Sequence, residues 1–231
     1  MNAPIIYEVD RARDGGSFST RRVVAIQHGR PIFNLAASFQ QPEPGLSHQA
    51  DKPGVPGPDG LKDLAEIASE HVDKLPEKLR RFMTDKRPFE CRPVEPVSMG
   101  ATDPQPPVKH VWIRAVDALA DDVALHQNLL AYVSDFELLA TSTLPHALSF
   151  TRGNVILASL DHALWFHRRF RMDEWLLYSM ESPNAGGARG YTRGQFFTQD
   201  GTLVASTTQE GLIRVVDPAK ARERSNPREQ V

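Results

Sequence analysis

The chain has 231 residues, of which 40% are hydrophobic and 24% are charged, so it can bury one large core or two small ones. Its net charge of −2 gives no electrostatic argument for binding to nucleic acid or to an anionic membrane. No run reaches the roughly 18 apolar residues of a membrane-spanning helix, and the start has no signal-peptide pattern. Together with the single cysteine, Cys91, these features predict a soluble cytoplasmic protein without disulfides or membrane insertion.

The first part of the chain has the pattern of a β-meander. Short runs of alternating apolar and polar residues are separated by turns that contain glycine, which is typical of antiparallel hairpins. The expected strands span residues 5–10, 18–27 and 32–39.

Residues 41–107 are crowded with proline, which fixes φ, donates no backbone hydrogen bond and so resists regular structure. Within this stretch, residues 60–83 have apolar positions at helical spacing with charges between them. We therefore expect a proline-rich connector with a helix or two on the surface. Residues 89–94 could open the next domain as a strand.

Residues 108–216 predict the best-formed unit of the chain. A strand over residues 108–115 is followed by a long helix, which we expect to begin at Asp121 as N-cap and to end at about Leu139. The strands expected after it span residues 155–166, 175–181, 191–198 and 203–216. One long helix followed by an antiparallel meander predicts an α+β fold in which the sheet wraps its helix. From Asp217 onward the charged tail is expected to be disordered.

The chain also repeats itself. Residues 5–16 resemble residues 176–187, an offset of 171 from Ile5 to Leu176, and residues 27–32 resemble residues 199–204 after one further residue. Self-similarity at this scale indicates a duplicated domain. The residues that precede the second copy have no counterpart before Ile5, so we expect the first copy to lack its helix and opening strands.

Three polar residues are candidates for chemistry. Asp135 has mostly uncharged neighbours one and two helical turns away, so its carboxylate would be partly desolvated; a surface aspartate near a helix end is the alternative. Ser159 ends one apolar face of its expected strand. Gln209 closes another strand, and a neutral amide can orient a water or donate to an oxyanion; a simple strand-end polar residue is the alternative.

The sequence argues against three other kinds of site. Strand alternation is expected to point His162 away from Ser159, and there is no Gly-x-Ser-x-Gly motif, so a serine nucleophile is not expected. There is no His-x-x-x-His or Cys-x-x-Cys ligand spacing for a metal. The glycine-rich residues 186–190 lie between expected strands and predict a turn rather than a phosphate-binding loop.

At these residues the chain resembles the acyl-CoA thioesterase II family, whose members are double hotdogs, with two helix-in-sheet units in one chain. The resemblance runs from about Pro4 to Arg214. Its most specific stretches are SLDHALWFH at residues 159–167, EWLLY at residues 174–178 and TQDGTLVASTTQEG at residues 198–211. The implied architecture is an α+β double hotdog with a truncated first repeat. Its expected parts are remnant strands of an N-terminal hotdog at residues 1–40, a connector at 41–85, a complete catalytic hotdog at 86–216 and a tail at 217–231.

The resemblance also implies a catalytic triad of Asp135, Ser159 and Gln209. These residues would activate a water for attack on the thioester carbonyl of fatty acyl-CoA, with no covalent acyl-enzyme, no cofactor and no metal. Backbone N–H groups near the helix would stabilise the oxyanion, and a hydrophobic pocket would hold the acyl chain. A homo-oligomer, dimer or tetramer, is the expected assembly.

Two alternatives remain open at this stage. The chain could be a truncated, non-catalytic module that binds acyl-CoA or assists assembly, or an incomplete gene model whose start lies inside the first hotdog. At the repeat offset the counterpart of Gln209 is Ala37, so the first copy shows no triad of its own.

Overall fold

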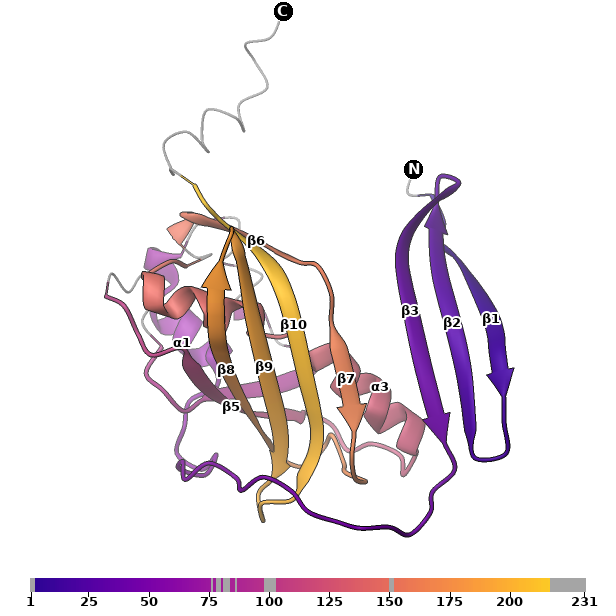
Figure 1. The fold of residues 1–231 in the computed structure, drawn as a ribbon. Helices are drawn as coiled ribbons and strands as arrows, with labels where there is room; N and C mark the ends of the chain where they lie inside the picture. Colours follow the sequence, from indigo (N-terminus) through magenta and orange to yellow (C-terminus); the bar gives the residue numbers. More distant parts are fainter. Residues whose placement is uncertain are drawn as a thin grey trace, which may run out of the picture. The chain divides into compact units, whose positions relative to one another are not determined.

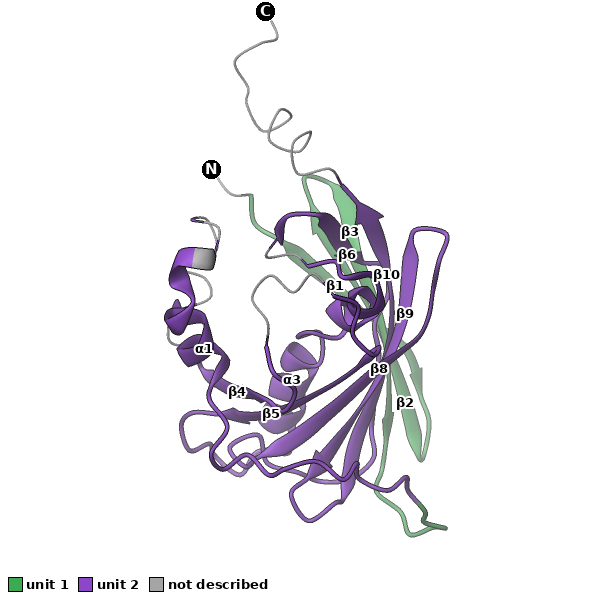
Figure 2. Ribbon diagram, turned by 90° about the vertical axis from the view of Figure 1, so that its left-hand side faces the viewer, with its two compact units in different colours: residues 1–48 green, residues 49–231 purple. Residues whose placement is uncertain are grey.

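The computed structural model describes residues 3–75, 77, 80, 84–85, 87–97, 103–149 and 152–216. It forms two compact units, residues 1–48 and residues 49–231, which are coloured separately in Figure 2. The expected disordered tail and much of the helical pattern after residue 75 lie outside the described residues. The finer domain boundaries at residues 40 and 85 stay predictions.

The first unit is a three-stranded antiparallel sheet (Figure 1). Its strands are β1 (Ile6–Asp14), β2 (Phe18–Gln27) and β3 (Arg30–Gln40), in that order. Between β2 and β3, His28 and Gly29 have φ values of 52° and 71°, as a tight hairpin turn with two left-handed residues requires. The predicted meander is confirmed, although β1 runs further than expected.

The second unit is built on a seven-stranded antiparallel sheet (Figure 1). Its strands are β4 (Phe89–Pro93), β5 (Val108–Ala115), β6 (Val155–Ser159), β7 (Ala163–Phe166), β8 (Leu176–Gly186), β9 (Arg189–Thr198) and β10 (Leu203–Val215). The order is β4-β5-β8-β9-β10-β6, and β7 also pairs with β10. The helix α3 (Val123–Val133) lies against the concave face of this sheet (Figure 2). Its Leu130 and Val133, both fully buried, pack in one cluster with Tyr178 and Phe196 of the sheet. The α+β prediction is confirmed.

The sequence repeat is also a repeat of strand irregularities. The β1–β2 pair shifts register between Asp10 and Arg13, and the β8–β9 pair shifts between Glu181 and Asn184, each 171 residues further along. The next pair shifts in both units as well, between Ala25 and Ile26 in β2–β3 and opposite Phe196 and Phe197 in β9–β10. Because β-bulges are specific local features, their coincidence supports a duplicated meander.

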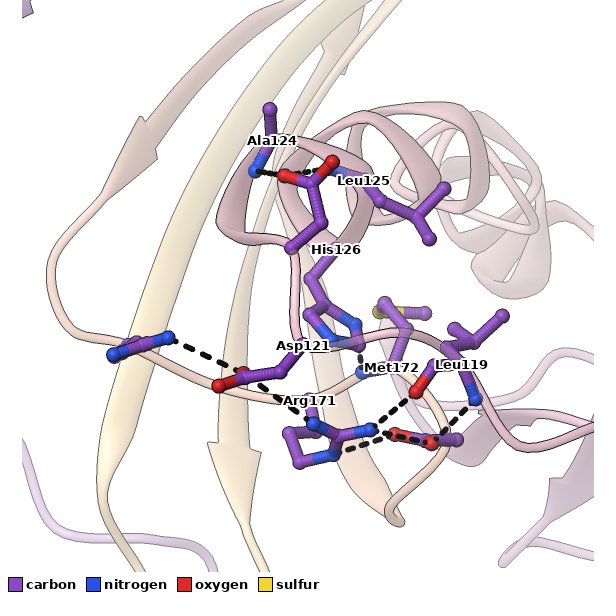
Figure 3. A network of polar contacts seen from close by, with 10 residues as sticks. Leu119, Asp121, Ala124, Leu125, His126, Arg171 and Met172 are labelled. Carbon is purple, nitrogen blue, oxygen red and sulfur yellow. Dashed lines mark hydrogen bonds and ion pairs between the residues drawn. The ribbon is translucent and has the colours of Figure 1, made fainter.

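The central helix differs from the prediction at both ends. Asp122 rather than Asp121 is the N-cap and accepts from the Ala124 and Leu125 amides at 2.9 and 3.4 Å. Asp121 instead forms ion pairs with Arg169 and Arg171, as Figure 3 shows for Arg171.

At its other end, α3 stops at Val133 and not near Leu139. Ser134 is the C-cap, and Glu137 takes a left-handed φ of 61° that breaks the helix before a 3₁₀ helix, η2 (Leu139–His146), begins. Asp135 therefore lies in the turn after the helix rather than on it.

Hydrogen bonds between side chains and backbone hold residues 49–58 of the proline-rich connector against the rest of the second unit. The Trp112 indole donates to the carbonyl of Pro56 at 2.8 Å, and Arg92 donates to that of Pro58 at 2.8 Å. Gln49 bonds both Gly201 and Leu203 of the β9–β10 connection. The segment thus follows the sheet without joining its ladder, as its prolines dictate.

A short surface helix, α1 (Leu64–Glu70), lies within the connector, as expected, and leads into a 3₁₀ turn, η1 (Val72–Lys74). Asp63 caps α1 through the Ala65 amide and also accepts from the Cys91 amide at 2.8 Å, so one carboxylate joins α1 to β4. Over the part of the chain that the structure describes, no helix is long and apolar enough to cross a membrane.

Candidate active site

The expected strand over residues 155–166 is broken, and the break shapes the site. The amides of Leu160 and Asp161 both donate to the Glu210 carbonyl, at 3.0 and 3.3 Å, while the Asp161 carboxylate accepts from the Glu210 amide. Residues 160–162 thus leave the strand between β6 and β7, and simple alternation no longer applies. The prediction that His162 points away from the Ser159 site is therefore wrong.

The structure brings Asp135, Ser159 and Gln209 together. The Gln209 amide donates from Nε2 to Asp135 Oδ1 at 2.5 Å and to Ser159 Oγ at 3.1 Å. Ser159 Oγ lies 3.3 Å from the same Asp135 Oδ1 and donates to it. Within the described residues Asp135 Oδ2 has no hydrogen-bond partner. One carboxylate oxygen is thus held by two donors, and the other is free to accept a proton.

The three side chains differ in exposure. Asp135 and Ser159 are exposed, whereas Gln209 is completely buried. The Gln209 backbone is anchored in β10, where its carbonyl also accepts from the Thr192 hydroxyl at 3.1 Å. Its side-chain Oε1 has no partner among the described residues, so the amide is turned wholly towards its donor contacts.

His162 is the residue that sequence reasoning missed. Its Nε2 lies 2.8 Å from Ser134 Oγ and 3.2 Å from Thr207 Oγ1, and its Nδ1 lies 3.3 Å from Gln209 Nε2. Partial burial lowers the pKa of the ring, and the carboxylates of Asp135 and Asp161 oppose that shift. The available signal was the polar pair Asp161-His162 inside an otherwise apolar run, which marks a strand interruption.

Tyr178 of β8 supports the turn that carries Asp135. Its hydroxyl donates to the Ser134 carbonyl at 2.5 Å, and its ring stacks on Phe196 with centroids 3.9 Å apart. Burial, followed by the nearby charge of Asp135, raises the pKa of Tyr178 well above its ordinary value. The phenol therefore stays protonated and keeps donating at any physiological pH.

A cavity lies beside α3, against β4 and β5. Its volume of about 440 Å³ is within the size range of small-molecule pockets. Tyr132 and Phe136, which flank Asp135 in the chain, line it together with Tyr178. The rest of its lining is apolar except for several charged residues, among them Lys109 and Glu137, which form an ion pair. The charge of Lys109 lowers the pKa of Glu137, so the Glu137 carboxylate stays ionised.

No cluster of three or more histidine, cysteine or carboxylate side chains suited to a metal ion occurs among the described residues.

Comparisons with known proteins give consistent results along the chain. A family described as acyl-CoA thioesterase matches residues 80–212, and one described as acyl-CoA thioesterase N-terminal domain matches residues 1–40. The chain is 40% identical over 220 residues to human acyl-coenzyme A thioesterase 8, covering 92% of this chain and 68% of that protein. It is 40% identical over 211 residues to acyl-CoA thioesterase 2 of Haemophilus influenzae, covering 91% and 74%.

Solved structures agree on the fold. The crystal structure of an acyl-CoA thioesterase II from Mycobacterium marinum matches with a TM-score of 0.72 and 42% identity, covering 91% of this chain and 74% of that one. A protein with a hotdog fold from Alicyclobacillus acidocaldarius matches with a TM-score of 0.69 over 92% and 74%, at 17% identity, which supports the fold alone. The hotdog prediction is confirmed.

Proposed function

Because the chain belongs to the acyl-CoA thioesterase family, we propose that it is a hydrolase that cleaves fatty acyl-CoA into a free fatty acid and CoA. The observation that carries the proposal to particular residues is the hydrogen-bonded group of Asp135, Ser159 and Gln209. Ser159 of β6 and Gln209 of β10 both contact the carboxylate of Asp135 in the turn after α3, and a carboxylate fixed in this way is suited to act as a general base.

The proposed reaction uses water directly. Asp135 Oδ2 takes a proton from a water whose oxygen attacks the thioester carbonyl carbon, while Ser159 and Gln209 hold Oδ1 and so fix the carboxylate plane. Collapse of the tetrahedral intermediate breaks the carbon–sulfur bond, and the CoA thiolate takes the proton from Asp135, which returns to its ionised form. A positioned general base contributes about 10²- to 10⁴-fold to such a step. Backbone N–H groups near the helix remain the predicted oxyanion donors.

We place the acyl chain in the cavity beside α3. Its apolar lining includes Phe136, the residue next to Asp135, so a chain bound there would start close to the proposed base. Val111 and Ile113 of β5 contribute its buried wall. Apolar atoms are disfavoured next to the charges of the Lys109–Glu137 ion pair. The ion pair would therefore limit how far the acyl chain can extend in that direction.

One observation favours an alternative. Asp135 and Ser159 are exposed, whereas thioester chemistry benefits from a site that excludes water. A module that binds acyl-CoA without hydrolysing it, or that needs assembly to become active, would have such a site. Assembly into the predicted homo-oligomer would cover the exposed site. We also propose a cytoplasmic location, as predicted from the sequence.

The test is release of free CoA from palmitoyl-CoA and shorter thioesters, followed with a thiol reagent. Asp135→Asn is expected to lose at least about 100-fold in kcat, because it removes the base, with Gln209→Ala also strongly impaired. Asp117→Asn, at an exposed carboxylate away from the site, is the matched control and should equal the wild type.

Full activity of Asp135→Asn would refute the role of Asp135. A wild-type protein that binds acyl-CoA in equilibrium dialysis but never releases CoA would establish the binding module instead.

A further inference from the structure

We propose that His162 is a positioning residue, which in its neutral form with the proton on Nε2 holds the Gln209 amide with its NH₂ group facing Asp135 and Ser159. The inference rests on the proposed function, since it concerns the geometry of the same site. It is carried by the hydrogen-bond pattern around the imidazole.

The hydroxyls next to His162 determine which ring nitrogen carries the proton. Ser134 Oγ donates to the Ala131 carbonyl at 2.9 Å, and Thr207 Oγ1 donates to the Ala163 carbonyl at 2.9 Å. Each hydroxyl has a single hydrogen and has thereby used it. Both can therefore only accept from His162 Nε2, which lies 2.8 and 3.2 Å from them. Nε2 is protonated, and in the neutral ring Nδ1 is an acceptor.

The Gln209 amide meets that acceptor. A carboxylate can only accept hydrogen bonds when ionised, so the NH₂ group of Gln209 must face Asp135. One N–H points to Asp135 Oδ1 at 2.5 Å. The second lies between Ser159 Oγ at 3.1 Å and His162 Nδ1 at 3.3 Å. His162 thus accepts on the side where a rotated amide would place its carbonyl.

This contact has a defined effect on the amide. The buried Oε1 of Gln209 has no partner among the described residues, so the observed orientation leaves an acceptor unsatisfied. Rotation of the amide would bring Oε1 against the Asp135 carboxylate. Neutral His162 adds an acceptor that favours the observed orientation, whereas a protonated ring would place an N–H against the amide N–H and favour the rotated one.

The charges around the ring set how this contact responds to pH. Asp135, after α3, and Asp161, beside His162 in the chain, both favour protonation, while its neighbours on β10, Thr207 and Gln209, are uncharged. Partial burial outweighs the two carboxylates and lowers the pKa, so the neutral ring persists to lower pH than in a free histidine. Activity should fall as His162 is protonated, which is expected at a pH below the pKa of a free histidine.

Two substitutions separate the two ring nitrogens. In His162→Asn the side-chain Oδ1 can take the place of Nδ1 as acceptor, but nothing titrates. In His162→Gln the side-chain amide can replace the Nε2–H donor, but the acceptor facing Gln209 is lost. His167, which follows β7 in the chain, provides the matched control His167→Asn; its Nε2 lies 2.8 Å from Ser206 Oγ.

The experiment combines kcat–pH profiles for palmitoyl-CoA with ¹⁵N NMR of the imidazole nitrogens in the resting protein. We expect the Nε2–H tautomer at His162, a loss of about 3- to 10-fold in kcat for His162→Gln, the size of one neutral hydrogen bond, and near-normal kcat for His162→Asn. The His162→Asn profile should also lose one ionisation on its acid side, which a purely structural role would not change.

The outcomes are decisive in either direction. A protonated Nδ1 in the neutral ring overturns the proposal, as does a His162→Gln enzyme with the wild-type profile. If both variants are impaired, an unchanged acid-side ionisation overturns it and a lost one supports it. The tautomer of His162 is measured in the resting protein, without turnover. A failure of the proposed hydrolysis would instead be detected by the Asp135→Asn comparison, so the two failures can be told apart.

Discussion

Gly194→Ala tests how the sheet supports the site. Gly194 lies in β9 opposite Met180 of β8 and Thr207 of β10. A Cβ there would lie 2.4 Å from the Tyr178 ring and 3.2 Å from the Thr207 methyl. The ring cannot simply move aside, because it stacks on Phe196 and its hydroxyl donates to the backbone next to Asp135.

The magnitude follows from two separate costs. Overpacking of a filled core costs about 1–3 kcal/mol, and loss of one neutral hydrogen bond about 1 kcal/mol. Gly194→Ala should therefore lower the free energy of unfolding by about 2–4 kcal/mol, whereas Tyr178→Phe, which removes only the hydroxyl, should cost about 1 kcal/mol. Because the displaced ring moves the Ser134 turn, kcat should also fall more in Gly194→Ala.

Urea unfolding followed by circular dichroism measures the stability, and CoA release measures the activity. Gly186→Ala is the matched control, since a Cβ at that end of β8 meets nothing within 4 Å. If Gly194→Ala is as stable and active as Gly186→Ala, the close packing of Tyr178 against β9 does not position the site.

Three further predictions concern Asp173, Cys91 and the cavity beside α3. Hydrogen bonds from Arg171 and from the Leu119 amide lower the pKa of Asp173 to about 2. Asp173→Asn should therefore lower the free energy of unfolding in urea by about 1–2 kcal/mol at neutral pH. That loss should narrow only as the pH falls from 3.8 towards 2; equal stability at neutral pH would contradict it. Burial raises the pKa of Cys91 to about 12, so iodoacetamide should leave the folded protein unmodified by mass spectrometry and react after unfolding; rapid modification when folded would refute this. Val111→Phe, which fills the cavity, should raise KM for long acyl chains several-fold and spare short ones; equal effects would place the acyl chain elsewhere.

Much of the fold could be predicted because its signals are local. Alternating apolar runs and glycine turns identified β2 and β5 at their observed ends, and the internal repeat extended to the β-bulges of both units. The ends of α3 could not be predicted. Asp121 and Asp122 are equivalent caps by sequence, and Asp121 is taken by arginines 48 and 50 residues away. Likewise, the left-handed turn at Glu137 carries no glycine to announce it.

The candidate site was predictable in part for the same reason. Asp135, Ser159 and Gln209 were recognised from their motifs, and the structure brings their side chains together. His162 was missed because its orientation depends on the break between β6 and β7. That break is held by Glu210, which lies 49 residues from Asp161 and becomes its neighbour only when β10 pairs with β6.

The most direct test of the central claim is one turnover of palmitoyl-CoA in ¹⁸O-labelled water with enzyme in excess. The account predicts a free fatty acid that carries one ¹⁸O atom, with the peptide containing Asp135 unlabelled, because water attacks the thioester directly. An unlabelled fatty acid together with ¹⁸O in Asp135 would show that the carboxylate is a nucleophile. Formation of no fatty acid at all would show that this chain does not hydrolyse its thioester.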